Sequence, residues 1–176
     1  MILKSLSLGM LFSMGCWAFS LQAKTYLDTD QAQKAAFPVT MLTKNSVTVT
    51  PEQQTKMTEA SSVRLPFDGK NIWKAADGGW FIIDQVVGKH EFITYSVAIN
   101  ANGTVKMVEI MEYNESYGYQ VKETSWLQQF VGKSAASPIK LNKDIDNISG
   151  ATLSSKHIAD GVKRVMTFYE LALKGQ

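Results

Sequence analysis

The middle of the chain has the hydrophobic pattern of β-strands. Trp80–Val87 is a dense apolar run with glycines on both sides, and Phe92–Ile99 alternates so that one face is apolar. Asn102-Gly103 predicts a tight type I′ turn, in which both central positions need positive φ. Residues 105–111 then return as a partner strand, and Ile72–Ala75 is a candidate for a further strand. These elements predict an antiparallel meander.

Two strand signals are less regular. The apolar phase of residues 105–111 slips between Met107 and Val108, which indicates either a β-bulge or a strand buried on both faces. Residues 46–49 alternate over a short distance and are interpreted as a short strand. The sheet would therefore gain one strand on the N-terminal side.

Helical signals lie before and after these strands. Residues 29–37 have a helix-forming composition and stop at Pro38. A second helix is predicted over Pro51–Ser61, with Thr50 as its N-cap and proline at its first position. A short helical piece is expected around residues 125–131.

The last helix is predicted over residues 156–173. Its apolar positions recur every three or four residues, so that one stripe faces a core: Ile158, Val162, Val165, Tyr169 and Ala172. Strands gathered in one region with helices at both ends imply an α+β fold. We expect an antiparallel sheet of about three to five strands, with N-terminal helices and a long C-terminal helix packed on it.

Residues 1–23 have the pattern of a secretory signal peptide. Lys4 lies near the start, residues 6–19 are apolar, and Ala23 is a small residue at a plausible cleavage site. One alternative is a membrane anchor, although the apolar stretch is shorter than the roughly 20 residues that a spanning helix needs. Another is a lipoprotein, because residues 13–16 faintly resemble a lipobox that ends at Cys16. We expect cleavage after Ala23 and a soluble periplasmic or otherwise extracytoplasmic protein.

The composition of the chain argues against several classes of function. The chain has 176 residues and a formal charge of +2, with no long run of one sign, which argues against nucleic-acid binding. Cys16 is the single cysteine, and cleavage after Ala23 would remove it. His90 and His157 are widely separated and do not have the local spacing typical of a metal-binding pair. Any redox or metal function would then rest on carboxylates, hydroxyls or a cofactor from outside.

The most informative stretch directly precedes the last predicted helix. It is a run of small and hydroxyl residues at a helix N-terminus, where free backbone N–H groups and the helix dipole favour an anion such as phosphate. The alternative is an ordinary loop without a ligand, in which Ser154 or Ser155 is the N-cap of the helix. The candidate residues are Asp146, Ser149, Gly150, Ala151, Thr152, Ser154 and Ser155.

The order Ser149-Gly150-Ala151-Thr152-x-Ser154-Ser155, with Asp146 before it, resembles the flavinylation motif of FMN-binding domains. Such domains occur in the C subunit of the sodium-translocating NADH:quinone oxidoreductase, in the G subunit of the Rnf complex and in stand-alone exported proteins. The resemblance implies a phosphoester between FMN and Thr152, made by a dedicated flavin transferase. It covers roughly residues 80–168, within a single FMN-binding domain over residues 24–176.

A second candidate segment follows the predicted meander. Glu112-x-x-Glu115-Ser116-Tyr117-Gly118 resembles the acidic loop of the same family. The subunits of the large complexes continue with Pro-Gly-x-Gly, which this chain lacks, so it resembles the stand-alone proteins more closely. Tyr113, Tyr117 and Tyr119 could stack on the flavin, and Glu115 could bond a ring N–H or the ribityl hydroxyls. Alternatively, these are turn residues and packing aromatics.

Four isolated residues have simple structural interpretations. Gly161 weakens the last helix by about 1 kcal/mol relative to alanine, which indicates close packing against the sheet or the flavin. His90 is read as a turn residue, and His157 either as solvent-exposed or as a donor to the FMN phosphate. Trp126 is read as a core residue in a segment that also resembles the family.

We therefore expect an exported flavoprotein with FMN joined through Thr152. It would act as a one- or two-electron carrier in an extracytoplasmic chain, with redox partner proteins that are membrane-bound. One alternative is a reductase domain that passes electrons to a small acceptor. Another is a flavin-free binding module. No nucleophile–base set stands out, so a carrier is favoured over an enzyme.

Overall fold

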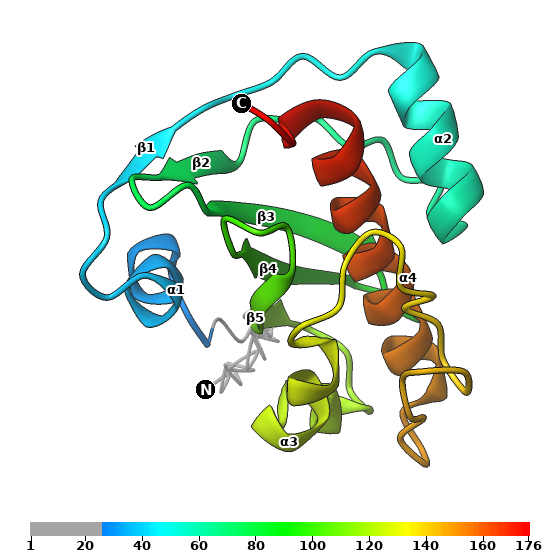
Figure 1. Cartoon of the computed structure of the whole chain (residues 1–176). Coiled ribbons are helices and arrows are strands. Elements are labelled where there is room, and N and C mark those ends of the chain that lie inside the picture. The colour runs from blue at the N-terminus through cyan, green and yellow to red at the C-terminus, as the bar shows by residue number, and fades with distance from the viewer. Residues whose placement is uncertain (1–25) are drawn as a thin grey trace, which may run out of the picture.

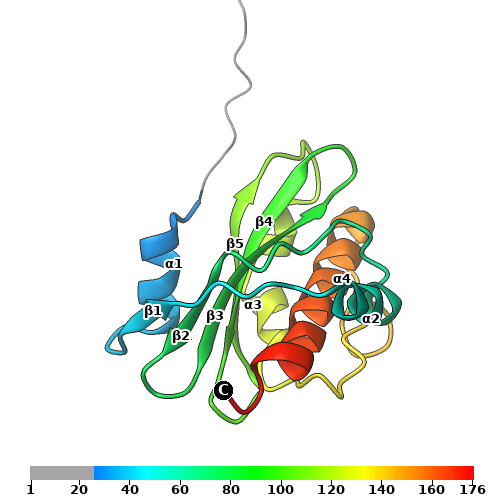
Figure 2. The same ribbon diagram turned by 90° about the horizontal axis from the view of Figure 1, so that it is seen from above.

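The computed structural model describes residues 26–176, so the predicted signal peptide at residues 1–23 and Cys16 lie outside the described residues. Five antiparallel strands form one sheet in chain order, β1-β2-β3-β4-β5 (Figure 1). They are β1 (Leu42–Lys44), β2 (Ile72–Ala75), β3 (Trp80–Val87), β4 (Phe92–Ile99) and β5 (Val105–Tyr113). Helix α1 covers one face of the sheet, and α2, α3 and α4 lie on the other (Figure 2). The predicted α+β class is confirmed.

The hairpin of β4 and β5 contains two bulges. Ala98 pairs with Met107 and Ile99 with Val105, which leaves Lys106 as an extra residue. A second shift lies farther along, between the partners of Thr94 and Tyr95. The break in the alternation of apolar residues within residues 105–111 is thus caused by β-bulges, which is one of the two predicted explanations.

The turn between these strands is not the predicted type I′ turn. Gly103 has φ +81°, whereas Asn102 is outside the left-handed region. The backbone N–H of Gly103 donates to the carbonyl of Asn100, and Asn100 N–H donates to Thr104 O. The connection is therefore a wider loop with one left-handed glycine, which accommodates the bulge at Lys106.

The short N-terminal strand lies a few residues before the predicted one. β1 is Leu42–Lys44, and its residue Leu42 pairs with Ala75 of β2. Residues 46–49 form no strand, and the prediction there was wrong. Val47 N–H donates to Gly69 O, and the Ser46 hydroxyl donates to Lys70 O. These bonds attach the segment to the loop before β2 and do not pair it with a strand.

The first two helices begin at complete capping boxes. In α1 (Thr29–Ala36) the carboxylate of Asp28 accepts from Gln31 N–H, and the Gln31 side chain accepts from Asp28 N–H. In α2 (Pro51–Ser61) Thr50 and Gln53 make the same reciprocal bonds. Both helices therefore start where local sequence signals placed them.

The last helix starts earlier than predicted. α4 spans Thr152–Phe168 and continues as a π-helical turn, η3 (Tyr169–Leu173). Its N-cap is Ala151, so neither serine caps it. The Ser155 hydroxyl instead donates back to the carbonyl of Ala151. Between β5 and α4 lie three short helical pieces: η1 (Tyr119–Lys122), α3 (Thr124–Leu127) and η2 (Gln128–Phe130).

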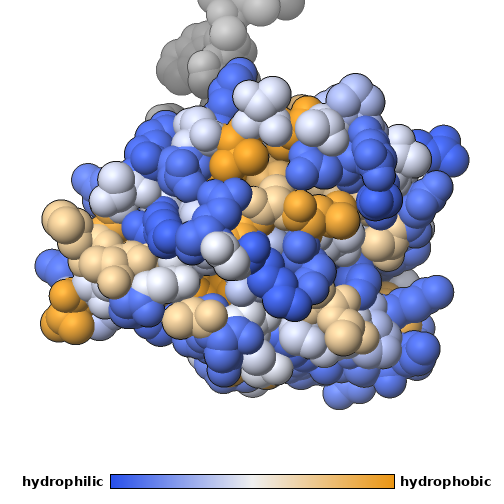
Figure 3. Space-filling view, turned by 45° about the horizontal axis from the view of Figure 1, so that its top comes forward, coloured by the Kyte–Doolittle hydropathy of each residue, from blue (hydrophilic) through white to orange (hydrophobic). Residues whose placement is uncertain are grey.

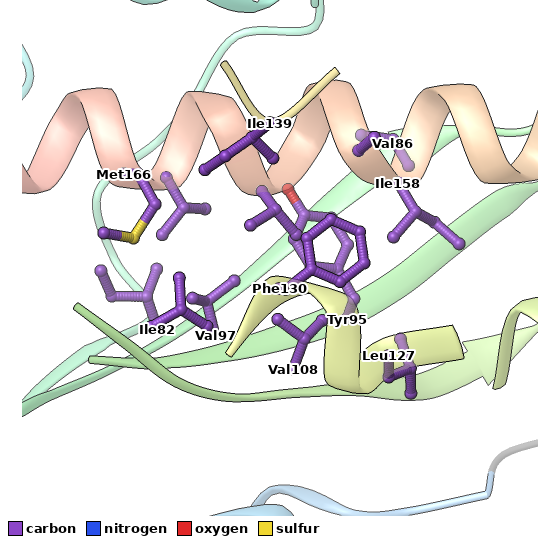
Figure 4. Close-up of a cluster of buried hydrophobic side chains, with 14 of the residues drawn as sticks. Ile82, Val86, Tyr95, Val97, Val108, Leu127, Phe130, Ile139, Ile158 and Met166 are labelled. Carbon is purple, nitrogen blue, oxygen red and sulfur yellow. The ribbon is translucent and has the colours of Figure 1, made fainter. Parts of the chain in front are cut away.

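The main core lies between the sheet and α4. Alternate residues of β4, including Tyr95 and Val97, face Ile158 and Met166 of α4, with Phe130 and Ile139 closing the side (Figure 4). A smaller cluster under α1 includes Phe37, Phe81, Ala98 and Met111. The face shown in Figure 3 is mostly hydrophilic, with apolar side chains in small separate groups.

A buried ion pair ties α4 to β3. The Arg164 side chain is fully buried, and its Nη2 lies 2.7 Å from Asp84 Oδ2, while Nε donates to the same oxygen at 3.0 Å. The Tyr95 hydroxyl, which points toward α4 in Figure 4, also donates to Asp84 Oδ2 at 2.6 Å. Gly161 allows this approach, because a Cβ there would lie 2.8 Å from Tyr95 Cζ. Of the two interpretations of Gly161, packing on the sheet is the one that the structure shows.

Candidate functional site

One cavity of about 570 Å³ lies where three segments meet. The segments are the β3–β4 turn, the loop after β5 and the start of α4. The cavity brings together seven residues that the sequence singled out: Glu115, Ser116, Tyr117, Gly150, Ala151, Thr152 and Ser154. Its size is within the range of about 300–1,000 Å³ that is usual for small-molecule sites.

Thr152 is the first residue of α4, and its side chain is exposed at the cavity. The amide Nδ2 of Asn147 donates to Thr152 Oγ1 at 3.1 Å. No side chain caps α4, in contrast to α1 and α2. The N–H groups of its first turn therefore have no capping side chain, and the positive end of the helix dipole faces the cavity. An anionic group would be stabilised there.

Four predicted residues do not line the cavity. Asp146 is exposed, and its backbone is fixed by Trp126, whose Nε1 donates to Asp146 O at 2.8 Å. Ser149 is exposed in the preceding loop, and Ser155 is fully buried beneath the helix start. Gly118, with φ +88°, packs against Ser154 and Ala151 but does not itself line the cavity. We therefore assign these residues to the frame of the cavity rather than to its surface.

Gly118 is required by both its conformation and its surroundings. Its left-handed φ suits glycine, and a Cβ there would lie 2.7 Å from Tyr113 Oη and 3.0 Å from Ser154 Oγ. The close contact lets the loop after β5 pack directly on the start of α4. Any larger residue would push these two walls apart.

Tyr113 joins the same two walls. Its ring is buried, and its hydroxyl contacts the Tyr117 carbonyl and lies 2.9 Å from Ser154 Oγ. Burial raises the pKa of the Tyr113 hydroxyl above its ordinary value, although the Ser154 hydrogen bond opposes the shift. Of the two interpretations of this tyrosine, the packing aromatic is the one that the structure shows. Tyr117, at 83% exposure, is the tyrosine that projects at the cavity.

Glu115 holds the β3–β4 turn against the loop after β5. One of its oxygens accepts from His90 N–H at 2.6 Å and from Glu91 N–H at 3.1 Å. Partial burial acts to raise the pKa of Glu115, but these N–H groups and that of Lys89 outweigh it and lower the pKa. The predicted hydrogen bond from a flavin N–H would have to share a carboxylate that already binds protein backbone.

Sequence reasoning missed three cavity residues. Lys89 and His90 line the cavity from the β3–β4 turn, and Leu153 lines it from α4 with its side chain half exposed. His90 was interpreted only as a turn residue, because nothing local indicates that the turn reaches α4. The signal that could have found Lys89 and His90 is the strand order, which places that turn beside the loop after β5. Leu153 occupies the unspecified position of the motif, between Thr152 and Ser154.

Two negative observations concern residues 26–176. This part of the chain has no group of three or more His, Cys, Asp or Glu side chains placed to hold a metal ion. It also has no helix that combines the length and the apolar character needed to cross a membrane.

Comparison with known families agrees with this geometry. Residues 88–167 match the family model described as the FMN-binding domain. The matched span begins at the β3–β4 turn, ends within α4 and contains every residue that lines the cavity. No curated protein matches the chain.

Proposed function

We propose that this chain, whose residues 88–167 match the FMN-binding domain, carries FMN covalently through a phosphoester on Thr152. We further propose that the loaded protein is an exported electron carrier. The observation that carries the proposal is the exposed hydroxyl of Thr152 at the uncapped start of α4, inside the matched span and at a cavity of about 570 Å³.

The position of Thr152 suits a phosphoester. Its Oγ1 is reached from solvent and oriented by Asn147, while the first-turn N–H groups of α4 can bind phosphate oxygens. In the transfer, the bond from Thr152 Oγ1 to phosphorus forms as the flavin donor's bond from phosphorus to its leaving group breaks. The hydroxyl proton goes to a base of the flavin transferase. The chain gains FMN less one water.

Other cavity residues have roles that follow from their chemistry. Lys89 and His90 place basic and hydrogen-bonding groups on the wall formed by the β3–β4 turn, where they would bind anionic or polar parts of the cofactor. Tyr117 and Leu153 present exposed apolar surface at the rim, which suits a planar ring system. FMN, when bound, supplies one- and two-electron transfer.

Export and partners are proposed from the sequence. The signal-peptide pattern of residues 1–23 would deliver the protein to an extracytoplasmic compartment. There a covalent bond prevents loss of a dilute cofactor by dissociation. The redox partners would be membrane-bound proteins that reach the cavity rim.

Intact-mass measurement tests the covalent bond. The protein is expressed with a flavin transferase, alongside Thr152→Ala and the matched control Thr43→Ala, which alters an exposed threonine of β1. We expect wild type and Thr43→Ala to gain FMN less one water and Thr152→Ala to gain nothing. Equal flavin on Thr152→Ala, or none on wild type, would refute the assignment.

A second assay separates a carrier from a reductase. The loaded protein is reduced chemically and mixed with small soluble acceptors in excess over protein. A carrier is expected to be reoxidised slowly by these acceptors and quickly by a protein partner. Multiple rapid turnovers of a small acceptor by the pure protein would favour the reductase alternative.

A further inference from the structure

A second cavity of about 280 Å³ lies beside the proposed flavin site. It opens between the segment after α2, the end of β3 and the second turn of α4. Val63, Leu65, Val86 and Val87 give it apolar walls, and Gly88 separates it along the β3–β4 turn from the first cavity. None of its lining residues belongs to the set that lines the flavin site.

The cavity carries one uncompensated positive charge. Lys156 and Asp160 both line it, but they pair with each other, with Lys156 Nζ 2.6 Å from Asp160 Oδ2. Arg64 also lines it, and no carboxylate of residues 26–176 lies within ion-pair distance of its guanidinium. A guanidinium without a partner can bind a carboxylate through two parallel hydrogen bonds.

His157 also lines the cavity, from the second turn of α4. Its Nδ1 is buried away from solvent, so a ligand in the cavity would contact other atoms of the imidazole ring.

The walls are held in place by bonds that do not involve the cavity. Arg164 Nη1 donates to Leu65 O at 2.6 Å, which fixes the segment after α2 to the buried ion pair. Val63 N–H donates to the Ser61 hydroxyl at 3.2 Å, just after Ser62 turns the chain with φ 64°. The cavity is thus formed before any ligand enters, which reduces the entropy lost on binding.

We propose that this second cavity binds a small organic monocarboxylate with a short apolar body. Arg64 would bind the carboxylate, and the valine and leucine side chains would contact the apolar part. The volume is just below the usual range for ligand sites, which limits the ligand to a small molecule. Binding here does not depend on flavin at Thr152.

Nuclear magnetic resonance titration of the flavin-free protein tests the proposal. The probes are benzoate and its neutral analogue benzamide, followed through the backbone amides of Val63, Val87 and His157. We expect saturable shifts with benzoate, and binding at least about tenfold weaker with benzamide or with the Arg64→Gln variant. Lys34→Gln in α1 is the matched control, because Lys34 is exposed on the opposite side of the sheet, and should bind benzoate like wild type.

Three results would overturn the proposal: no saturable shift with benzoate, equal affinity for benzamide, or unchanged benzoate affinity in Arg64→Gln. Arg64 is exposed, so its replacement should leave the thermal midpoint near that of wild type. Because the flavin-free protein is used, failure here is distinguishable from failure of the Thr152 assignment.

Discussion

Replacing Asp84 with alanine is expected to lower the free energy of unfolding by about 3–5 kcal/mol. The substitution leaves Arg164 fully buried without a counter-ion. It also removes the acceptor of the Tyr95 hydroxyl, which now donates at 2.6 Å. Arg164 would keep only the carbonyls of Leu65 and Gln85 as partners, and neutral carbonyls cannot balance a buried cation.

The electrostatic balance at this pair gives the reason for the loss. Burial raises the pKa of Asp84 above its ordinary value, and the Arg164 guanidinium and the Tyr95 hydroxyl oppose this shift only in part. The charged carboxylate therefore depends on its partners, as the guanidinium depends on the carboxylate. Removing one partner costs far more than removing both, because a lone buried charge stays desolvated.

The assay is equilibrium unfolding in urea, followed by tryptophan fluorescence. Tyr95→Phe removes one hydrogen bond to a charged group and should lose about 1.5–3 kcal/mol. Glu59→Ala, on the exposed side of α2, is the control and should stay within about 0.5 kcal/mol of wild type. The double variant Asp84→Leu with Arg164→Met should lose less than Asp84→Ala.

A loss below about 1 kcal/mol for Asp84→Ala would refute this reasoning, because it would mean that water reaches Arg164 in the native state. A double variant less stable than Asp84→Ala would also contradict it. In that case the pair would contribute through shape rather than through charge.

Three further predictions concern other parts of the fold. Gly161→Ala should lower the free energy of unfolding, measured in urea, by about 1–3 kcal/mol despite the better helix propensity of alanine. The reason is that the new methyl group would lie 2.8 Å from Tyr95 Cζ. A stabilised variant would contradict the packing described. Burial acts to raise the pKa of Glu115, but N–H groups such as that of His90 outweigh it, and the pKa lies below its ordinary value of 4.5. The charged carboxylate therefore stabilises the fold above pH 4.5. This stabilisation is lost as the pH falls through the pKa of the folded state. Urea midpoints should therefore favour wild type over Glu115→Gln at neutral pH and converge in acid; a constant difference would be inconsistent with this linkage. Thr50→Ala removes the α2 N-cap and should cost about 1 kcal/mol in urea, and an unchanged midpoint would show that the capping box contributes nothing.

Local signals predicted the elements that depend on local chemistry. Thr50 and Pro51 mark the start of α2 in the sequence, and the structure begins that helix there. The start of α4 was predicted four residues late, because Ser154 and Ser155 look like N-caps. In the structure the Ser155 hydroxyl binds the carbonyl of Ala151 inside a helix already under way. A hydroxyl residue near a helix start does not reveal which backbone group it binds.

Features set by tertiary structure could not be predicted. Asp84 and Arg164 are 80 residues apart in sequence, and no periodicity connects them. Likewise, only the strand order shows that His90 and Glu115 meet, because each sits in a different loop. The motif around Thr152 was visible because its residues are consecutive, whereas the wall that faces it comes from other parts of the chain.

The open start of α4 would link maturation to stability if FMN is joined to Thr152 as proposed. A phosphate on Thr152 would bond the first-turn N–H groups only while the helix exists, so loading would increase resistance to unfolding. Because the proposed ester would not dissociate, this gain would not vary with the supply of free flavin, unlike the gain from a dissociating ligand. Proteases of the compartment would then degrade unloaded copies first, and the helix end that receives the cofactor would also distinguish finished molecules from unfinished ones.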